Sequence, residues 1–65
     1  MALVELARYS RNEAHIVVGR LEAEGIPAVA FDAGSSIADG SWLLIPVRVM
    51  VDEDDIAEAR TIVAA

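Results

Sequence analysis

The sequence predicts a single α+β domain, and two observations lead to that prediction. An apolar strand pattern followed by a helix cap and an amphipathic helix occurs twice, at residues 3–21 and again at 49–60. A further apolar strand pattern lies between them at residues 26–31. Because 65 residues have room for one hydrophobic core, we expect residues 1–65 to form one domain.

The first repeat begins with a strand over residues 3–8, in which Val4 and Leu6 alternate with a polar residue. Ser10 and Glu13 then have the spacing of a capping box. In that motif the serine hydroxyl accepts the N–H of the third helical residue, and the glutamate carboxylate accepts the serine N–H. A helix is therefore expected to start directly after Ser10.

This helix is expected to continue to about Glu24. Gly25 suits the left-handed conformation that commonly ends a helix, and Pro27 restricts the residue before it to extended conformations. An apolar stripe with helical spacing should face the core, and it consists of Ala14, Val17, Val18 and Leu21.

The second strand is predicted over residues 26–31. Alternation places Val29 and Phe31 on one face of this strand, and Ala28 and Ala30 on the other. Residues 32–41 contain two glycines and three serines, which predicts a loop.

The third strand is expected to begin at Val47, because Pro46 cannot donate a ladder hydrogen bond in a central strand. Val47, Val49 and Val51 should face the core, with Arg48 and Met50 on the opposite face. Asp52 should cap the second helix, whose inner face consists of Ile56, Ala59, Ile62 and Val63.

The element order β-α-β-β-α predicts how the sheet is arranged. The first two strands should be parallel through a right-handed crossover, with the third inserted antiparallel between them in the order 1-3-2. Both helices would then cover one face of the sheet. This is a ferredoxin-like α+β sandwich with three strands.

Three segments of the chain resemble a known family. They are Glu5-Leu6-Ala7-Arg8-Tyr9-Ser10, Leu21-Glu22-Ala23-Glu24-Gly25-Ile26-Pro27-Ala28 and Val47-Arg48-Val49-Met50-Val51-Asp52-Glu53-Asp54-Asp55. The family consists of small bacterial proteins described as putative prokaryotic signal-transducing proteins, and the likeness covers nearly the whole chain. The family often has proline at the position of Asp52, which exchanges one helix-start residue for another, and glycine near Pro46. The resemblance implies a ferredoxin-like fold with the architecture of nitrogen-regulatory PII proteins, and it implies no catalytic or ligand residues.

Composition excludes several classes of partner. Eleven acidic residues against five basic ones, all arginine, give a net charge of −6. Nucleic acids and anionic membrane surfaces are bound by clustered positive charge, so neither is an expected partner. The absence of cysteine excludes disulfides and thiolate metal sites. The N-terminus lacks the pattern of a signal peptide, so a cytoplasmic location is expected.

Two possible sites have plainer explanations. The acids Asp52, Glu53, Asp54 and Asp55 would suit a hard cation, but acids in a first helical turn also complement the helix dipole. Their spacing lacks the alternating ligands of a calcium loop, so we expect a helix start and no metal. His15 has no cysteine or serine at a catalytic spacing and is expected on a solvated helix surface. No cofactor is expected, and no enzyme activity.

Trp42 stands beside a loop that contains Ser35 and Ser36. An aromatic side chain there would either stack on a ligand or anchor a partner, or close the end of a small core. The backbone N–H groups of this loop would suit an anion, although the lysine of a phosphate loop is missing. Trp42, Ser35 and Ser36 are the candidate ligand residues of the sequence.

The face of the sheet away from the helices is the candidate interface. Alternation assigns to it Leu3, Glu5, Ala7, Ala28, Ala30, Arg48 and Met50. An apolar patch of several hundred Å² is unusual on a monomer, and a two-fold homodimer is the commonest closed assembly. We therefore expect a non-enzymatic regulatory or interaction module that acts as a homodimer or docks on a partner protein. The alternative is a small-metabolite sensor that uses residues 32–41 and Trp42.

Overall fold

The computed structural model of the protein describes residues 2–32 and 46–64. Its elements in chain order are β1 (Leu3–Tyr9), α1 (Arg11–Ala23), β2 (Ala28–Asp32), β3 (Val47–Asp52), the 3₁₀ turn η2 (Glu53–Asp55) and α2 (Ile56–Ala64). The predicted order β-α-β-β-α is confirmed. The predicted start of β3 at Val47 is confirmed as well.

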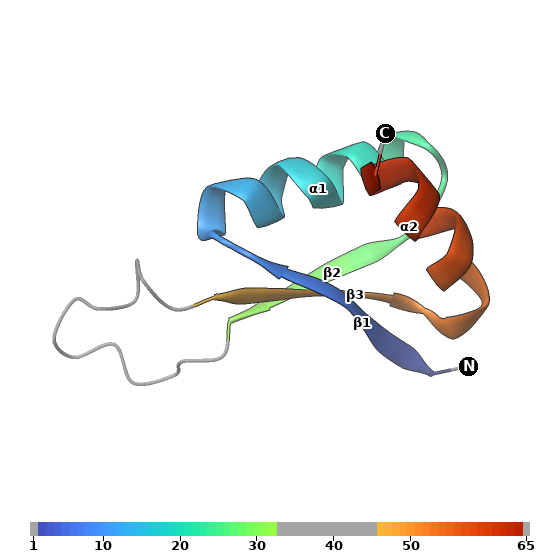
Figure 1. Ribbon diagram of the computed structural model, residues 1–65, viewed down its shortest axis with the longest axis horizontal. Coiled ribbons are helices and arrows are strands. Elements are labelled where there is room, and N and C mark those ends of the chain that lie inside the picture. The colour runs from blue at the N-terminus through green and yellow to red at the C-terminus, as the bar shows by residue number, and fades with distance from the viewer. Residues whose placement is uncertain (1, 33–45, 65) are drawn as a thin grey trace, which may run out of the picture.

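The three strands form one sheet in the order β1-β3-β2, and β3 is antiparallel to both of its neighbours. Figure 1 shows α1 and α2 on the same side of this sheet. The predicted ferredoxin-like arrangement is therefore confirmed. We call the side under the helices the covered face and the opposite side the open face, since no helix of the described residues lies on it.

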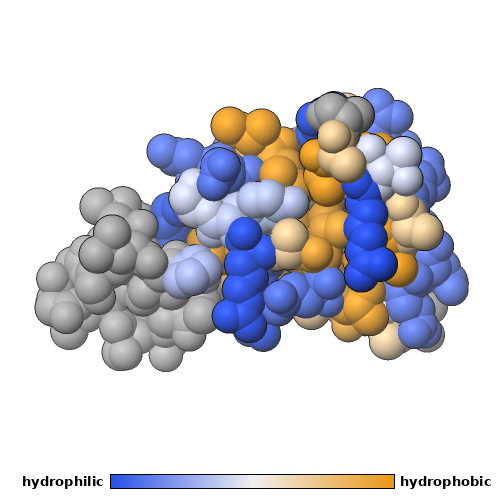
Figure 2. All heavy atoms as spheres, viewed as in Figure 1, coloured by the Kyte–Doolittle hydropathy of each residue, from blue (hydrophilic) through white to orange (hydrophobic). Residues whose placement is uncertain are grey.

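The hydrophobic core lies between the covered face and the two helices. Val47, Val49 and Val51 of the central strand are each at most 2% exposed. Leu21 of α1 and Ala59 of α2 are fully buried above them. Hydrophobic side chains fill this space and are bordered by hydrophilic ones on the surface (Figure 2). The three valines of β3 therefore face the core, as the sequence pattern predicts.

Both ends of α1 form the motifs that the sequence predicts. The Glu13 N–H donates to Ser10 Oγ over 3.2 Å, and the Ser10 N–H donates to Glu13 Oε1 over 3.4 Å. At the other end Gly25 has a φ of 86°. The N–H of Ile26 then donates to the Leu21 carbonyl over 2.9 Å, and both of these side chains are buried. This 6→1 bond and its hydrophobic contact are those of a Schellman motif.

Strand β1 contains a β-bulge that simple alternation does not predict. Glu5 is opposite Met50, but Ala7 is opposite the next residue of β3, Val49. Leu6 is therefore an extra residue, and from Ala7 onward the faces of β1 are exchanged. As a result Tyr9 is opposite Val47 on the covered face and packs against the core.

The helix-side face of β2 also differs from the expectation. Ala28 is opposite Val51 and Ala30 is opposite Val49, so both alanines lie on the covered face. The larger Val29 and Phe31 lie on the open face, and each is 42% exposed. The small side chains of β2 thus lie on the same side of the sheet as Ala14 of α1, which is 1% exposed.

The second helix begins as predicted at Asp52, although its first turn is 3₁₀. Asp52 Oδ1 accepts the N–H of Asp54 over 2.9 Å, which caps η2. The Glu53 N–H donates to the carbonyl of Ala2 over 2.9 Å. This bond continues the β1–β3 ladder past the end of both strands.

Candidate functional site

The open face of the sheet is the most distinctive surface of the described residues. Within the described ranges, four large hydrophobic side chains are strongly exposed, namely Leu3, Ile16, Val29 and Phe31. Three of them, Leu3 at 50% and Val29 and Phe31 at 42% each, lie on the open face. The fourth, Ile16, lies on α1. Exposed hydrophobic residues are common singly, but a group of them on one flat face indicates a contact surface.

Charged side chains lie among these hydrophobic residues. Arg8 and Arg48 are directly opposite each other on β1 and β3, an arrangement in which like charges repel. The Glu5 carboxylate accepts from Arg8 Nε over 3.3 Å and neutralises one of the two. The bulge makes this pair possible, because it brings Glu5 and Arg8 onto the same face.

Arg48 is the second cation of the open face. Its Nε–H group is buried and donates to no acceptor within residues 2–32 and 46–64. Within one chain, the Glu5 carboxylate contacts Arg8. The open face thus combines exposed hydrophobic side chains with one arginine that lacks a carboxylate partner in the described part of the chain.

The structure places four of the seven residues assigned to the candidate interface on the open face. Leu3, Glu5, Arg48 and Met50 lie there, as expected. The placement of Ala7, Ala28 and Ala30 is wrong. The bulge moves Ala7 to the covered face, and the register of β2 with β3 places Ala28 and Ala30 opposite the buried Val51 and Val49, on that same face.

Sequence reasoning assigned the residues of β2 to the wrong faces, and so missed Val29 and Phe31. It correctly put these two side chains on one face and the alanines on the other. It then assumed that the larger pair points to the core. The available signal was Ala14 in the apolar stripe of α1, since a small helix residue allows a close approach that suits small strand residues.

The predicted ligand residues Ser35, Ser36 and Trp42 lie outside the described residues, as does most of the predicted loop at 32–41. Asp32, the first residue of that loop in the prediction, belongs to β2. The ligand role of these residues stays a prediction.

The acidic run at the start of α2 is a helix cap in the structure. Asp52 uses its carboxylate to accept the N–H of Asp54, and Glu53, Asp54 and Asp55 lie in the first turn. Across residues 2–32 and 46–64, no group of three or more histidine or acidic side chains is arranged to hold a metal ion.

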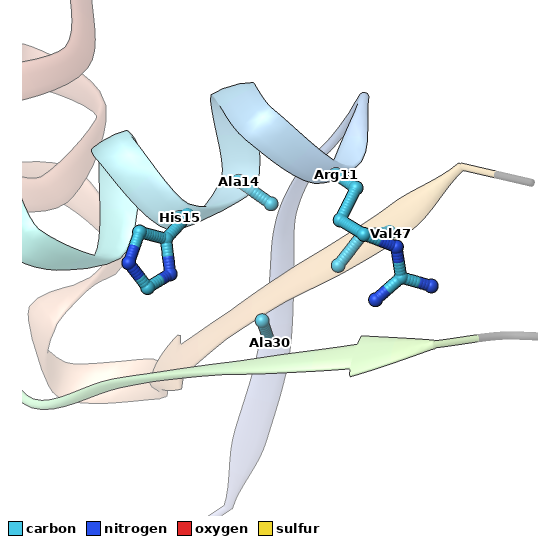
Figure 3. Close-up of a pocket in the computed structure, with 5 residues that line it drawn as sticks. All are labelled: Arg11, Ala14, His15, Ala30 and Val47. Carbon is cyan, nitrogen blue, oxygen red and sulfur yellow. The ribbon is translucent and has the colours of Figure 1, made fainter. Parts of the chain in front are cut away.

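A hollow of about 190 Å³ lies on the covered face, between the start of α1 and strands β2 and β3. Ala14, Ala30 and Val47 line it together with Arg11 and His15. Figure 3 shows Arg11 and His15 projecting from α1 toward the sheet on either side of Ala14. The prediction for His15, a solvated helix surface, agrees with its exposure.

Comparison with known proteins assigns the chain to a family. No curated protein and no solved structure matches the chain. In the part of the chain that the structure describes, no helix is long and apolar enough to cross a membrane. A family model described as "putative prokaryotic signal transducing protein" matches residues 3–65. That match spans every strand and helix described above, and the chain therefore belongs to this family.

Proposed function

We propose that the protein is a non-enzymatic cytoplasmic regulatory module that works as a homodimer through the open face of its sheet. The observation that carries the proposal is the grouping of Leu3, Val29 and Phe31 on that face, each between 42% and 50% exposed. Burying such side chains contributes about 25 cal/mol per Å² of apolar surface. The family description supports a role in signal transduction.

Charge favours a second copy of the chain as the occupant. The net charge of −6 makes two copies repel each other over most of their surface. The open face carries Glu5, Arg8 and Arg48, with Asp52 at its end beside Leu3, so it is close to neutral. Two copies therefore meet with the least repulsion through this face.

A two-fold axis would also supply a partner for Arg48. In an isologous interface each contact occurs twice, so a carboxylate of one copy that reaches Arg48 of the other forms two ion pairs. Glu5 lies on the same face and already contacts Arg8 over 3.3 Å. A carboxylate has room for more than one guanidinium, and Glu5 is thus suited to bridge Arg8 and the second copy's Arg48.

The test compares two charge insertions at exposed hydrophobic positions. Phe31→Glu adds a carboxylate to the open face, whereas Ile16→Glu adds one to the solvent side of α1, where Ile16 is 67% exposed. By sedimentation equilibrium at micromolar concentration, the parent and Ile16→Glu should be dimers and Phe31→Glu a monomer. A parent that sediments as a 6.9 kDa species would overturn the homodimer. A Phe31→Glu dimer would show that the copies meet through a different face.

A further inference from the structure

The hollow beside α1 exists because two alanines face each other. Ala14 of α1 and Ala30 of β2 point toward one another across it (Figure 3). Larger side chains at these two positions would fill the space between the helix and the sheet. The alanine methyl groups are too small to do so and leave the space open. Ala14 and Val47 are 1% and 2% exposed, so they form an apolar floor, while Ala30 remains exposed at the mouth.

Among the described residues, the polar side chains that line the hollow are both basic. Arg11 and His15 are four residues apart on α1 and therefore lie on the same side of the helix. The chain has five arginines and one histidine against eleven acids. Two of those six basic groups thus line one hollow of an acidic protein, and the side chains between them are apolar.

We propose that this hollow binds a short aliphatic carboxylate. The carboxylate would lie between the Arg11 guanidinium and the His15 imidazole, and the hydrocarbon part would contact Ala14, Ala30 and Val47. Guanidinium groups bind carboxylates through two parallel hydrogen bonds. An apolar floor disfavours inorganic phosphate, because a phosphate there would lack donors for most of its oxygens.

The volume limits the size of the ligand. At roughly 30 Å³ per water molecule, the 190 Å³ hollow has room for roughly six non-hydrogen atoms. Isobutyrate, a branched acid, has that size. A ligand so small is expected to bind with a Kd of about 1 mM.

This inference goes beyond the proposed dimer and does not depend on it, because the hollow lies on the covered face. A site for a small carboxylate would allow the protein to respond to a metabolite. Binding by Phe31→Glu should therefore equal binding by the parent, whether or not the parent is a dimer.

The experiment follows the amide resonances of ¹⁵N-labelled protein during titration with three probes. Isobutyrate should give saturable shifts at Arg11, Ala14, His15, Ala30 and Val47. Isobutyramide has the same shape without the charge, and inorganic phosphate has charge without an apolar part. Both should bind at least about tenfold more weakly than isobutyrate, a difference of one decade in Kd.

Three variants separate the two halves of the proposed contact. Arg11→Gln removes the guanidinium and should raise the Kd at least about tenfold. Ala30→Leu keeps both basic groups and fills the hollow, so it should abolish binding; Ala30 is exposed and tolerates a larger side chain. Arg20→Gln is the matched control, since it removes the same charge from the last turn of the same helix, and its Kd should not change.

Three outcomes would overturn the proposal. The first is an absence of saturable shifts up to about 10 mM isobutyrate, ten times the expected Kd. The second is equal binding of isobutyramide, which would show that the basic groups are not used. The third is equal loss of affinity in Arg20→Gln and Arg11→Gln, which would show attraction by general charge only.

Discussion

Single residues set the limits of α1. Ser10 and Glu13 satisfy each other's N–H groups at the start of the helix, and Gly25 adopts a φ of 86° just after its end. The first N–H and last C=O groups of any helix lack partners within it, and these residues help to provide such partners at the two ends of α1. A total stability of roughly 3–10 kcal/mol is expected for 65 residues, so single caps matter.

Replacement of Ser10 by alanine should therefore lower the free energy of unfolding by about 0.5–2 kcal/mol. The variant loses the acceptor of the Glu13 N–H. Ser10→Asp keeps an acceptor and should remain close to the parent. Urea denaturation followed by circular dichroism measures both. Equal stability of Ser10→Ala and the parent would mean that the capping box does not stabilise α1.

The same substitution at two glycines should have opposite effects. A Cβ atom at Gly19 or at Gly25 would meet no atom within 4 Å, so the backbone alone decides. Gly19 lies inside α1, and Gly19→Ala should stabilise the protein by about 0.5–1 kcal/mol. Gly25→Ala forces alanine into a left-handed conformation and should cost about 1–2 kcal/mol. Thermal unfolding of the two variants would contradict this explanation if both changes had the same sign.

At the scale of elements, two local features shape the fold: the acidic residues between β3 and α2, and the bulge of β1. Asp52 ends β3 and also caps η2, so one residue joins strand and helix without a loop. The bulge at Leu6 lets Val4, Leu6 and Tyr9 all pack against the core, although their spacing changes from two residues to three. Bulges also weaken an edge strand as a template for pairing with other strands.

Conversion of Asp54 and Asp55 to asparagine tests the role of the acidic run. We expect the fold to persist with a loss of about 0.3–1 kcal/mol per residue, because the negative charges that complement the helix dipole are gone. Asp52, the cap itself, stays in place. Calorimetric titration of the parent with Ca²⁺, Mg²⁺ and Mn²⁺ should show no binding tighter than about 1 mM. Stoichiometric micromolar binding that the double variant loses would make the run a metal site.

At the scale of the whole molecule, the two faces of the sheet differ completely. The covered face is closed by both helices, and the central valines beneath them are nearly inaccessible. The open face exposes Val29 and Phe31 to solvent, at 42% each. A small domain buries only about 60% of the surface of its unfolded chain, so a dimer through the open face would add a substantial share of the total stability.

The denaturation midpoint should consequently depend on protein concentration. Association stabilises the folded state by mass action, and a tenfold rise in concentration should increase the urea midpoint of the parent. In Phe31→Glu, whose open face no longer associates, the midpoint should be constant. A constant midpoint in the parent at all micromolar concentrations would argue against the dimer independently of sedimentation.

Much of the fold follows from local signals in the sequence. Alternation of apolar residues marks the strands, and the Ser10–Glu13 box, Gly25 and Asp52 mark where the helices begin and end. The order of the elements and the short connections then restrict the topology to a β1-β3-β2 sheet under two helices. These signals suffice because caps, turns and periodicity depend on residues that are close in the chain.

The tertiary structure alone decided which face each edge strand presents to the helices. Alternation groups Val29 with Phe31 and Ala28 with Ala30, but it does not say which pair faces the helices. The register of β2 with β3 decides this, because it places the two alanines opposite the buried Val51 and Val49. The register of β1 likewise depends on its pairing with β3. That pairing leaves Leu6 as a bulge, and the bulge places Ala7 on the covered face and Arg8 on the open face. The side chains that the open face exposes and the hollow beside α1 both depend on these choices. The sequence predicts the open face as a candidate interface, but it does not determine which residues of β1 and β2 lie there, because that depends on packing between segments that are distant in the chain.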